Sequence, residues 1–279
     1  ANMIGLTQSM LAAAERIFEL LDAEEMEEER DKEELPVIVG DVQFKHVSFG
    51  YTPEVILMED LNIDVKAGET VAIVGPTGAG KTTVINLLMR FYDITSGAIE
   101  IDGHNIQDYT VDSLRSKVGM VLQDTWLFKG TIRENIRYSR PDATDEEVVQ
   151  AAKQAFADDF IRKLPDGYDT YITEETDNIS GGQKQLLTIA RAILASPSIF
   201  ILDEATSNVD TRTEMQIQKA MDHIMEHKTS FVIAHRLSTI RNANKILVMQ
   251  KGNVIEQGTH EELLAKQGFY AGLYRAQFE

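Results

Sequence analysis

The chain has 279 residues, enough for one large domain or two small ones with a sizeable buried core. Its formal net charge of −18 argues against a nucleic-acid-binding protein, because affinity for a phosphate backbone needs clustered Lys and Arg. It contains no cysteine, which excludes disulfides and thiolate metal sites, and no apolar run approaches the roughly 18 residues of a membrane-spanning helix.

The first 22 residues carry apolar side chains at mostly three- and four-residue spacings, which predicts a helix with one apolar stripe. The stripe consists of Ile4, Leu6, Met10, Leu11, Ile17, Phe18 and Leu21. An acidic run follows at residues 24–34, which we interpret as a solvated linker rather than a binding segment. A stripe that needs a partner, in a chain that begins at Ala1 rather than Met, suggests a piece of a longer polypeptide.

The globular part is expected to begin near Val37. Residues 42–49 and 61–65 alternate between apolar and polar side chains, which predicts two half-exposed strands that form an antiparallel edge beside the core. Residues 98–101 predict a further alternating strand that ends in a turn.

A glycine-rich stretch follows the apolar run at residues 71–74 and precedes a helical pattern at residues 84–89. It fits G-x-x-x-x-G-K-[ST], in which glycines let backbone N–H groups close on phosphate oxygens. Lys81 would reach the terminal phosphates, and the Thr82 hydroxyl would bind Mg²⁺. The alternative, a glycine-rich turn with a solvated lysine, is disfavoured by the strand before and the helix after. The candidate nucleotide-binding residues are Gly75, Pro76, Thr77, Gly78, Ala79, Gly80, Lys81, Thr82 and Thr83.

Four continuous apolar runs each end at residues suited to phosphate or metal chemistry. Such runs are typical of strands buried on both faces, and hence of a parallel sheet covered by helices. They are residues 71–74 before Gly75, 118–122 before Gln123, 199–202 before Asp203 and Glu204, and 231–234 before His235. Ligands in such sheets bind beyond the carboxyl ends of the strands, so we expect a single site there.

Between Gln123 and Ser180 the apolar strand runs stop and helical patterns take over. Thr144 to Glu147 form a capping box that opens a helix, and the economical interpretation is an inserted helical subdomain at about residues 124–195. Further along, residues 245–250 and 253–257 predict a hairpin, and residues 259–262 predict the capped start of a short helix. The end of the chain is also expected to be helical.

Two further motifs bear on chemistry. Asp203 suits Mg²⁺, usually through water, and Glu204 suits a water poised for attack. The stretch from Ser180 to Gln183 precedes a helical run and is therefore a second glycine-rich anion site, although in isolation an N-capped helix with a glycine turn would be the favoured interpretation.

Taken together, these motifs resemble the ABC-transporter ATPase family in their order and spacing, from about residue 40 to residue 279. Phe49 to Tyr51, residues 123–136 and the amphipathic helix in front resemble the exporter branch, in which the ATPase follows a transmembrane domain. The resemblance implies an α/β P-loop NTPase core with a mostly parallel sheet, an antiparallel β edge subdomain and the inserted helical subdomain. Residues 1–36 would be a helix and linker from a preceding transmembrane domain, and residues 37–279 the ATPase domain.

The resemblance also implies a role for each matching residue. Tyr51 would stack on adenine, and Gln123 would contact Mg²⁺ and the attacking water. Glu204 would be the general base, and His235 would hold the γ-phosphate and that water in place. Asp210 would carry signals between two ATP sites. The candidate metal-binding residues are Thr82, Gln123 and Asp203.

The implied assembly is a dimer of two ATPase domains that bind ATP and Mg²⁺ at the cytoplasmic face of a membrane. The candidate residues for contact with the partner's ATP are Ser180, Gly181, Gly182 and Gln183. In the family, the stretch with Trp126, Leu127 and Phe128 meets the transmembrane domain; from the residues alone we interpret these side chains as core.

The sequence departs from the family pattern at two places. Residues 173–176 retain a family glutamate, Glu174, but lack the glycines that usually flank it, which puts cross-talk with the transmembrane partner in doubt. Asn208 and Val209 replace the commoner Ala-Leu and resemble one half of two-gene exporters, so a different partner chain is favoured over an identical one.

Two alternatives come from other function classes. A non-transport ABC ATPase acting on DNA or ribosomes would need basic surface or long coiled-coil inserts, and the acidic balance and the absence of heptads disfavour it. A small-molecule kinase could use the same phosphate loop but would leave the Ser180 to Gln183 motif unexplained.

Overall fold

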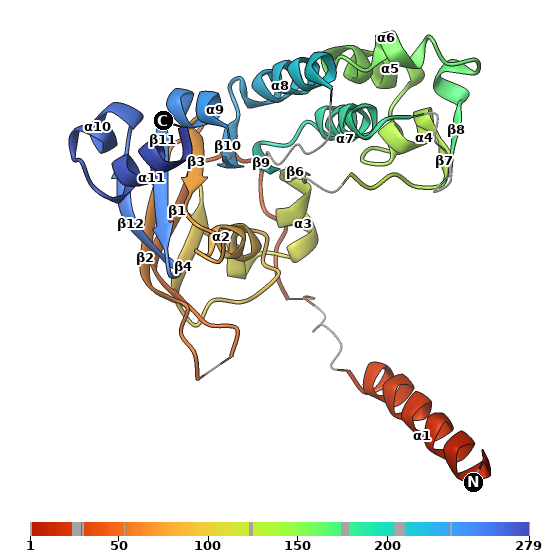
Figure 1. Cartoon of the computed structure of the whole chain (residues 1–279), viewed down its shortest axis with the longest axis horizontal. Coiled ribbons are helices and arrows are strands. Elements are labelled where there is room, and N and C mark those ends of the chain that lie inside the picture. Colours follow the sequence, from red (N-terminus) through yellow and green to blue (C-terminus); the bar gives the residue numbers. More distant parts are fainter. Residues whose placement is uncertain are drawn as a thin grey trace. The chain divides into compact units, whose positions relative to one another are not determined.

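The computed structural model describes residues 2–23, 29, 31–52, 54–122, 125–173, 179–203, 210–234 and 236–278 (Figure 1). The chain divides into two compact units, Ala1–Lys32 and Glu33–Glu279. The assignment of residues 1–36 and 37–279 to separate functional domains stays a prediction.

The first unit contains the predicted N-terminal helix, α1 (Asn2–Leu21). Its large apolar side chains are exposed, from 57% for Ile17 to 82% for Met3, so the stripe has no cover within this unit. Among the helices that the structure describes, none combines the length and the apolarity needed to cross a bilayer.

The second unit is built on a six-stranded sheet in the order β12-β11-β3-β10-β9-β6. The first five of these strands in chain order are mutually parallel, and the last runs antiparallel to its neighbour. The strands are β3 (Thr70–Val74), β6 (Val118–Val121), β9 (Ile199–Asp203), β10 (Thr229–Ile233), β11 (Lys245–Gln250) and β12 (Asn253–Gly258). The predicted parallel sheet, its four apolar runs and the hairpin at residues 245–257 are confirmed.

The side chains of the central sheet enter two different cores because successive residues point to opposite faces. Ala72 and Val74 lie in a core with residues of α7 (Gly181–Ala195) and α8 (Thr211–Met225). Val71 and Ile73 lie in a second core with α2 (Lys81–Leu88). Both faces of the sheet are therefore covered, as continuous apolar strands require.

The second core is closed by an antiparallel sheet in the order β2-β1-β4-β5. Its strands are β1 (Val42–Phe49), β2 (Met58–Val65), β4 (Ser96–Ile101) and β5 (His104–Asn105). Alternate residues of β1, among them Val42 and Phe44, are buried, as the sequence pattern predicts. The predicted antiparallel edge thus forms a sheet of its own that packs beside the central one.

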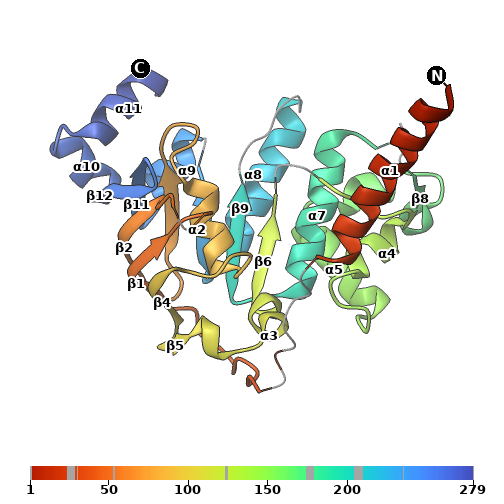
Figure 2. The ribbon, with the colours of Figure 1, turned by 90° about the horizontal axis from the view of Figure 1, so that it is seen from below.

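The predicted helical subdomain lies at one end of the central sheet, beyond β6, and the C-terminal helices lie at the other end, beyond β12 (Figure 2). Thr131, Thr144 and Ser180 each accept a bond from the backbone three residues on, and each starts a helix through a reciprocal capping box. The elements here are β7 (Gly130–Thr131), α4 (Ile132–Arg137), α5 (Asp145–Gln154), α6 (Asp158–Ile161), a 3₁₀ turn η2 (Gly167–Asp169) and β8 (Tyr171–Ile172). The pairing of β7 with β8 is a short strand pair that the sequence analysis missed.

The remaining helices are short apart from the last. They are η1 (Ile106–Asp108), α3 (Val111–Ser116), α9 (Leu237–Asn242), α10 (His260–Ala265) and α11 (Phe269–Phe278). The predicted cap at Thr259 and the helical C-terminal segment are confirmed.

The turn between β11 and β12 packs directly against the phosphate loop. Its residues Lys251 and Gly252 have positive φ angles of 49° and 85°, and Gly252 N donates to Ala79 O at 2.9 Å. A Cβ atom on Gly252 would lie 1.8 Å from Leu57 O. The turn therefore requires glycine for both its conformation and its close contact.

We expect Gly252→Ala to lower the free energy of unfolding by about 2–4 kcal/mol, the sum of left-handed strain and overpacking. Gly68→Ala is the matched control, because Gly68 also has a positive φ, of 79°, but a Cβ there meets nothing within 4 Å. Urea unfolding measures the free energy of unfolding of both variants. An equal decrease in the two variants would show that the close contact with Leu57 O does not contribute.

Candidate functional site

The predicted phosphate loop, Gly75–Gly80, connects β3 to α2 and is closed by a hydrogen bond from Ala79 N to Pro76 O (3.2 Å). Gly80 adopts the left-handed conformation, φ 98°, directly before α2, and makes no side-chain cap. The amides of the first turn of α2 therefore lack a side-chain acceptor from the cap residue. A helix start of this kind is suited to bind an anion.

Lys81 is the first residue of α2, and its side chain folds back over the loop. Its Nζ donates to Gly75 O at 2.8 Å and to Pro76 O at 3.1 Å. Burial lowers the pKa of the Lys81 ammonium, and the nearby charge of Asp203 acts in the opposite direction. A lysine ammonium has three N–H donors, so one remains for a ligand above the loop.

The loop lines a pocket of about 430 Å³ that also includes Tyr51 and Asp203. The structure thus brings together residues predicted separately for base, phosphate and metal contacts. The lining residues are Tyr51, Leu57, Thr77, Gly78, Ala79, Gly80, Lys81, Thr82, Thr83, Asp203 and Ile233. The Thr82 hydroxyl and the Asp203 carboxylate are hard oxygen donors of the kind that Mg²⁺ prefers, so the residues present fit this ion.

Tyr51 lies at the rim of this pocket with its side chain half exposed (52%). Its ring meets Phe49 and Tyr92 edge to face, with centroid distances of 4.9 and 5.0 Å. Its hydroxyl shares a hydrogen bond of 2.9 Å with the hydroxyl of Thr83. The ring is therefore oriented by contacts on its sides and at its tip.

The predicted catalytic residues Gln123, Glu204 and His235 lie outside the described residues, as does Glu174. The strands that precede the three catalytic candidates, β6, β9 and β10, are parallel neighbours in the central sheet. Their carboxyl ends therefore lie along one edge, next to that of β3 and its phosphate loop.

The segment from Ser180 to Gln183 starts α7 and does not line the pocket of the phosphate loop. Ser180 N donates to Gln183 Oε1 at 3.0 Å, and Gln183 N donates to Ser180 Oγ at 3.3 Å. Ser180 and Gly181 are exposed, whereas Gly182 is buried. This second glycine-rich helix start is accessible from outside the chain, and its cap is occupied by its own side chains.

Asp210 caps the N-terminus of α8. Its carboxylate accepts hydrogen bonds from Arg212 N at 3.1 Å and from Thr213 N at 3.0 Å. Hydrogen bonds from the Thr213 side chain and from backbone amides lower the pKa of Asp210, so the carboxylate is charged at neutral pH.

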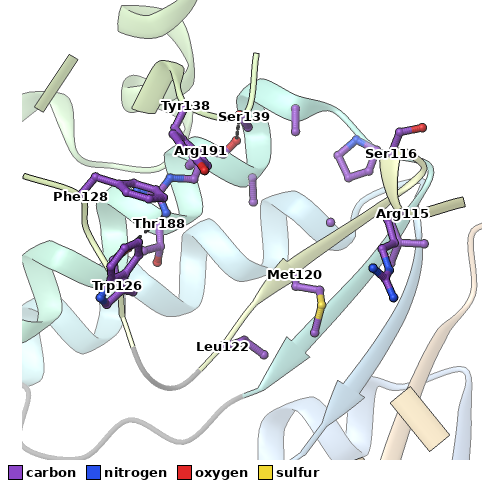
Figure 3. A pocket seen from close by; sticks show the side chains of 15 residues that line it. Arg115, Ser116, Met120, Leu122, Trp126, Phe128, Tyr138, Ser139, Thr188 and Arg191 are labelled. Atoms are coloured by element: carbon purple, nitrogen blue, oxygen red, sulfur yellow. Dashed lines mark hydrogen bonds between the residues drawn. The ribbon is translucent and has the colours of Figure 1, made fainter. Parts of the chain in front are cut away.

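A second cavity, of about 480 Å³, lies between the central sheet and the helical subdomain (Figure 3). We call it the aromatic groove. Trp126, Phe128, Tyr138 and Arg191 lie on one side of it, and Met120 and Leu122 lie opposite. Its lining residues are Arg115, Ser116, Val118, Gly119, Met120, Leu122, Trp126, Phe128, Tyr138, Ser139, Thr188, Arg191, Ala192, Ala195 and Pro197.

Arg191 organises the aromatic side of this groove. Its guanidinium lies 5.4 Å from the Phe128 ring centroid and 5.7 Å from that of Tyr138, and these two rings stack at 3.9 Å. It also donates to Trp126 O at 3.1 Å and to Asn135 O at 2.8 Å. Burial lowers the pKa of Arg191, and Tyr138 acts in the opposite direction.

The prediction that residues 126–128 are core is wrong for Trp126, which is 64% exposed. Leu127 is partly buried against the core, and Phe128 lines the groove. An exposed tryptophan beside stacked rings is typical of a surface that binds a partner.

Comparison with known proteins identifies the chain. Residues 58–207, more than half of it, match the family model described as ABC transporter. The chain belongs to the ABC transporter family.

Relatives of known sequence are long ABC transporters of which this chain spans less than half. A fatty acid ABC transporter ATP-binding/permease protein of Mycobacterium tuberculosis (strain CDC 1551) is 55% identical over 276 residues, covering 99% of this chain and 44% of that protein. A putative multidrug export ATP-binding/permease protein of Staphylococcus aureus (strain NCTC 8325) is 50% identical over 263 residues, covering 94% and 46%.

A solved structure, that of a bacterial Atm1-family ABC exporter with ATP bound, superposes with a TM-score of 0.85. It is 44% identical and covers 98% of this chain and 48% of that one. The predicted ABC family, its exporter branch and its α/β fold are therefore confirmed. The roles of individual site residues in this ABC domain stay predictions.

Two groups of residues in this ABC domain escaped the sequence analysis. Tyr92 packs against Tyr51, which lines the pocket, and Tyr138 and Arg191 complete the aromatic groove. Each comes from a segment distant in sequence from its neighbours, so no local spacing pairs them. The signal available in the sequence was an aromatic residue beside a motif, to which no role had been assigned.

Proposed function

We propose that this chain is the ATP-hydrolysing domain of an exporter, which dimerises around ATP and powers export by an attached transmembrane domain at the cytoplasmic face of a membrane. The observation that carries the proposal is the pocket of about 430 Å³ in which the phosphate loop, Tyr51 and Asp203 meet. A base-stacking residue, a phosphate cradle and an oxygen ligand for a cation together fit a nucleoside triphosphate with Mg²⁺.

Each part of the pocket handles one part of ATP. Tyr51 stacks on adenine, and the amides of the loop and of the start of α2 bind phosphate oxygens. Lys81 turns from the carbonyls of Gly75 and Pro76 to the terminal phosphates. Thr82, Asp203 and Gln123 would hold Mg²⁺, which neutralises phosphate charge when bound.

The residues that follow strands β6, β9 and β10, beside the phosphate loop, would carry out hydrolysis. The Glu204 carboxylate accepts a proton from water while the water oxygen attacks the γ-phosphorus, and the bond to the ADP oxygen breaks. His235 and Gln123 hold the γ-phosphate and the water in line. The products are ADP and inorganic phosphate.

The second anion site points to a partner domain. Ser180 and Gly181 are exposed at the start of α7, and the segment from Ser180 to Gln183 lies outside the chain's own pocket, so we assign this segment to the ATP held by a second ATPase domain. Asp210, charged and exposed at the start of α8, would connect the two sites. The sequence at Asn208 and Val209 favours a different chain as partner; a full-length protein that purifies as an active homodimer with two equivalent sites would refute that choice.

The aromatic groove supplies a place for the transmembrane domain. It presents exposed Trp126 and Tyr138 in a cavity of about 480 Å³, enough for side chains of an intracellular segment. The exposed apolar stripe of α1 is a further surface for that domain.

Release of inorganic phosphate from ATP tests the enzymatic part of the proposal. The purified chain should release phosphate with Mg²⁺ and with no acceptor molecule present. A small-molecule kinase would instead transfer the γ-phosphoryl group to an acceptor hydroxyl, so ADP that forms only when a hydroxyl compound is added, without release of inorganic phosphate, would overturn the proposal.

A single cysteine tests the groove, because the chain has no cysteine of its own. We expect Ser139→Cys, in the groove, to react with a maleimide several-fold more slowly in the full-length transporter than in the isolated chain. Glu226→Cys, at an exposed site after α8, is the control and should react at the same rate in both. If the Ser139→Cys thiol reacted at the same rate in the full-length transporter as in the isolated chain, as the control does, the groove would not be a docking site.

A further inference from the structure

Three aromatic rings meet at the rim of the nucleotide pocket: Phe49, Tyr51 and Tyr92. Resting on the proposed role of Tyr51, we propose that Tyr92 is a positioning residue for ATP binding, which holds the Tyr51 ring in the orientation that stacks on the base. Tyr92 acts through Tyr51 and needs no contact of its own with the nucleotide.

The geometry of the rings supports a holding role. Tyr92 and Tyr51 are perpendicular, with an interplanar angle of 90° and centroids 5.0 Å apart, and Phe49 meets Tyr51 at 80° and 4.9 Å. In such edge-to-face pairs the positive ring edge meets the negative ring face, which favours one mutual orientation. Phe49 is buried (2% exposed), so this side of Tyr51 rests on the core.

The tip of Tyr51 is fixed as well. Its hydroxyl bonds to the Thr83 hydroxyl at 2.9 Å, and Thr83 is buried in the first turn of α2. Tyr51 itself lies in the connection between β1 and β2, outside any regular element. The orientation of its ring therefore depends on these side-chain contacts, one of which is the contact with Tyr92.

Tyr92 is a firm support because its backbone segment is anchored. The guanidinium of Arg115 donates to Met89 O at 3.1 Å and to Arg90 O at 3.0 Å, and it also lies 4.7 Å from the centroid of the Phe91 ring. Phe91 N donates to Asn86 O at 2.9 Å. The segment that carries Tyr92 is thus held by α3 and α2 before any ligand arrives.

The role belongs to the ring of Tyr92 rather than to its hydroxyl. In the part of the chain that the structure describes, its ring packs against the rings of Phe49 and Tyr51, and its hydroxyl makes no hydrogen bond there. A pre-oriented Tyr51 loses less conformational freedom when the base binds, which raises affinity without a new contact. Tyr92→Phe should therefore preserve the function, and Tyr92→Leu should lose it.

The experiment compares ATP with inorganic tripolyphosphate, which carries the phosphates without a base, both with Mg²⁺ and by calorimetry on the whole chain. We expect Tyr92→Leu to weaken ATP binding by about 2- to 10-fold, as for loss of an edge-to-face pair, and to leave tripolyphosphate binding unchanged. In hydrolysis it should raise KM with kcat unchanged. Tyr92→Phe should match the wild type, and Tyr51→Leu should weaken ATP binding at least as much as Tyr92→Leu.

Unchanged ATP affinity in Tyr92→Leu, with weakened binding in Tyr51→Leu, would overturn the inference and leave the proposed role of Tyr51 intact. Equal weakening of ATP and tripolyphosphate in Tyr92→Leu would show a general structural defect and would also overturn it. Wild-type protein that binds tripolyphosphate as tightly as ATP would remove the role of Tyr51 and the inference together.

Discussion

Lys81→Ala should abolish measurable ATP hydrolysis and weaken nucleotide binding. The ammonium is half-buried over the phosphate loop, and in the proposed function it is the cation that meets the terminal phosphates. Loss of a group that stabilises developing charge in a transition state typically reduces turnover by about 10²- to 10³-fold. Phosphate release and nucleotide titration on the same preparation measure both effects.

Lys163→Ala is the matched control for Lys81→Ala, because it removes the same charge from an exposed position after α6. Its turnover and nucleotide affinity should equal those of the wild type. If Lys81→Ala behaves in the same way as this control, the loop does not bind phosphate and the proposed function fails at its foundation.

Glu204→Gln should slow hydrolysis and leave nucleotide binding intact. The amide keeps the shape of the side chain but cannot accept the proton of the attacking water, and general-base catalysis is typically worth roughly 10²- to 10⁴-fold. The effect should appear in kcat, because an interaction made in the chemical step is removed while ground-state contacts persist.

The same variant should trap the dimer. With ATP and Mg²⁺ between Lys81 of one domain and the Ser180 to Gln183 segment of the other, the closed assembly forms but does not turn over. Turnover and the ATP-dependent shift in molar mass should be measured together. Both should be measured for this chain alone and for this chain mixed with the different partner chain that the sequence favours. Near-normal hydrolysis would show that another residue is the general base. Absence of an ATP-dependent dimer with either partner would contradict the proposed interface in which two domains share ATP.

The fold was readable from the sequence where the signal is local. Continuous apolarity at residues 199–202 and 231–234 marks strands buried on both faces, and both lie in the middle of the parallel sheet. Thr144 and Thr259 with a glutamate three residues on predict helix starts, and both form capping boxes. These features depend on neighbours within a few residues.

The parts that were missed depend on contacts between distant segments. The β7–β8 pair has two residues in each strand, too few for any periodicity. Trp126 looks like a core residue because apolarity alone does not say whether the cover comes from the same chain or from a partner. The contact between Tyr51 and Tyr92 joins the connection after β1 to the segment after α2, and no spacing rule links the two.

The two glycine-rich helix starts, those of α2 and α7, differ in one respect that bears on the proposed transport cycle. The start of α2 has no side-chain cap hydrogen bond, so a phosphate that binds there gains new hydrogen bonds. At the start of α7 the amides of Ser180 and Gln183 are already matched by each other's side chains, so in the proposed dimer a phosphate from the partner exchanges these two bonds for others. The net gain in free energy at α7 is then a small difference between similar terms. In the proposed dimer, ATP would therefore stay bound to the phosphate loop of its own domain, while its contact with α7 of the partner would break easily. That is the asymmetry which a dimer that opens after each turnover would require.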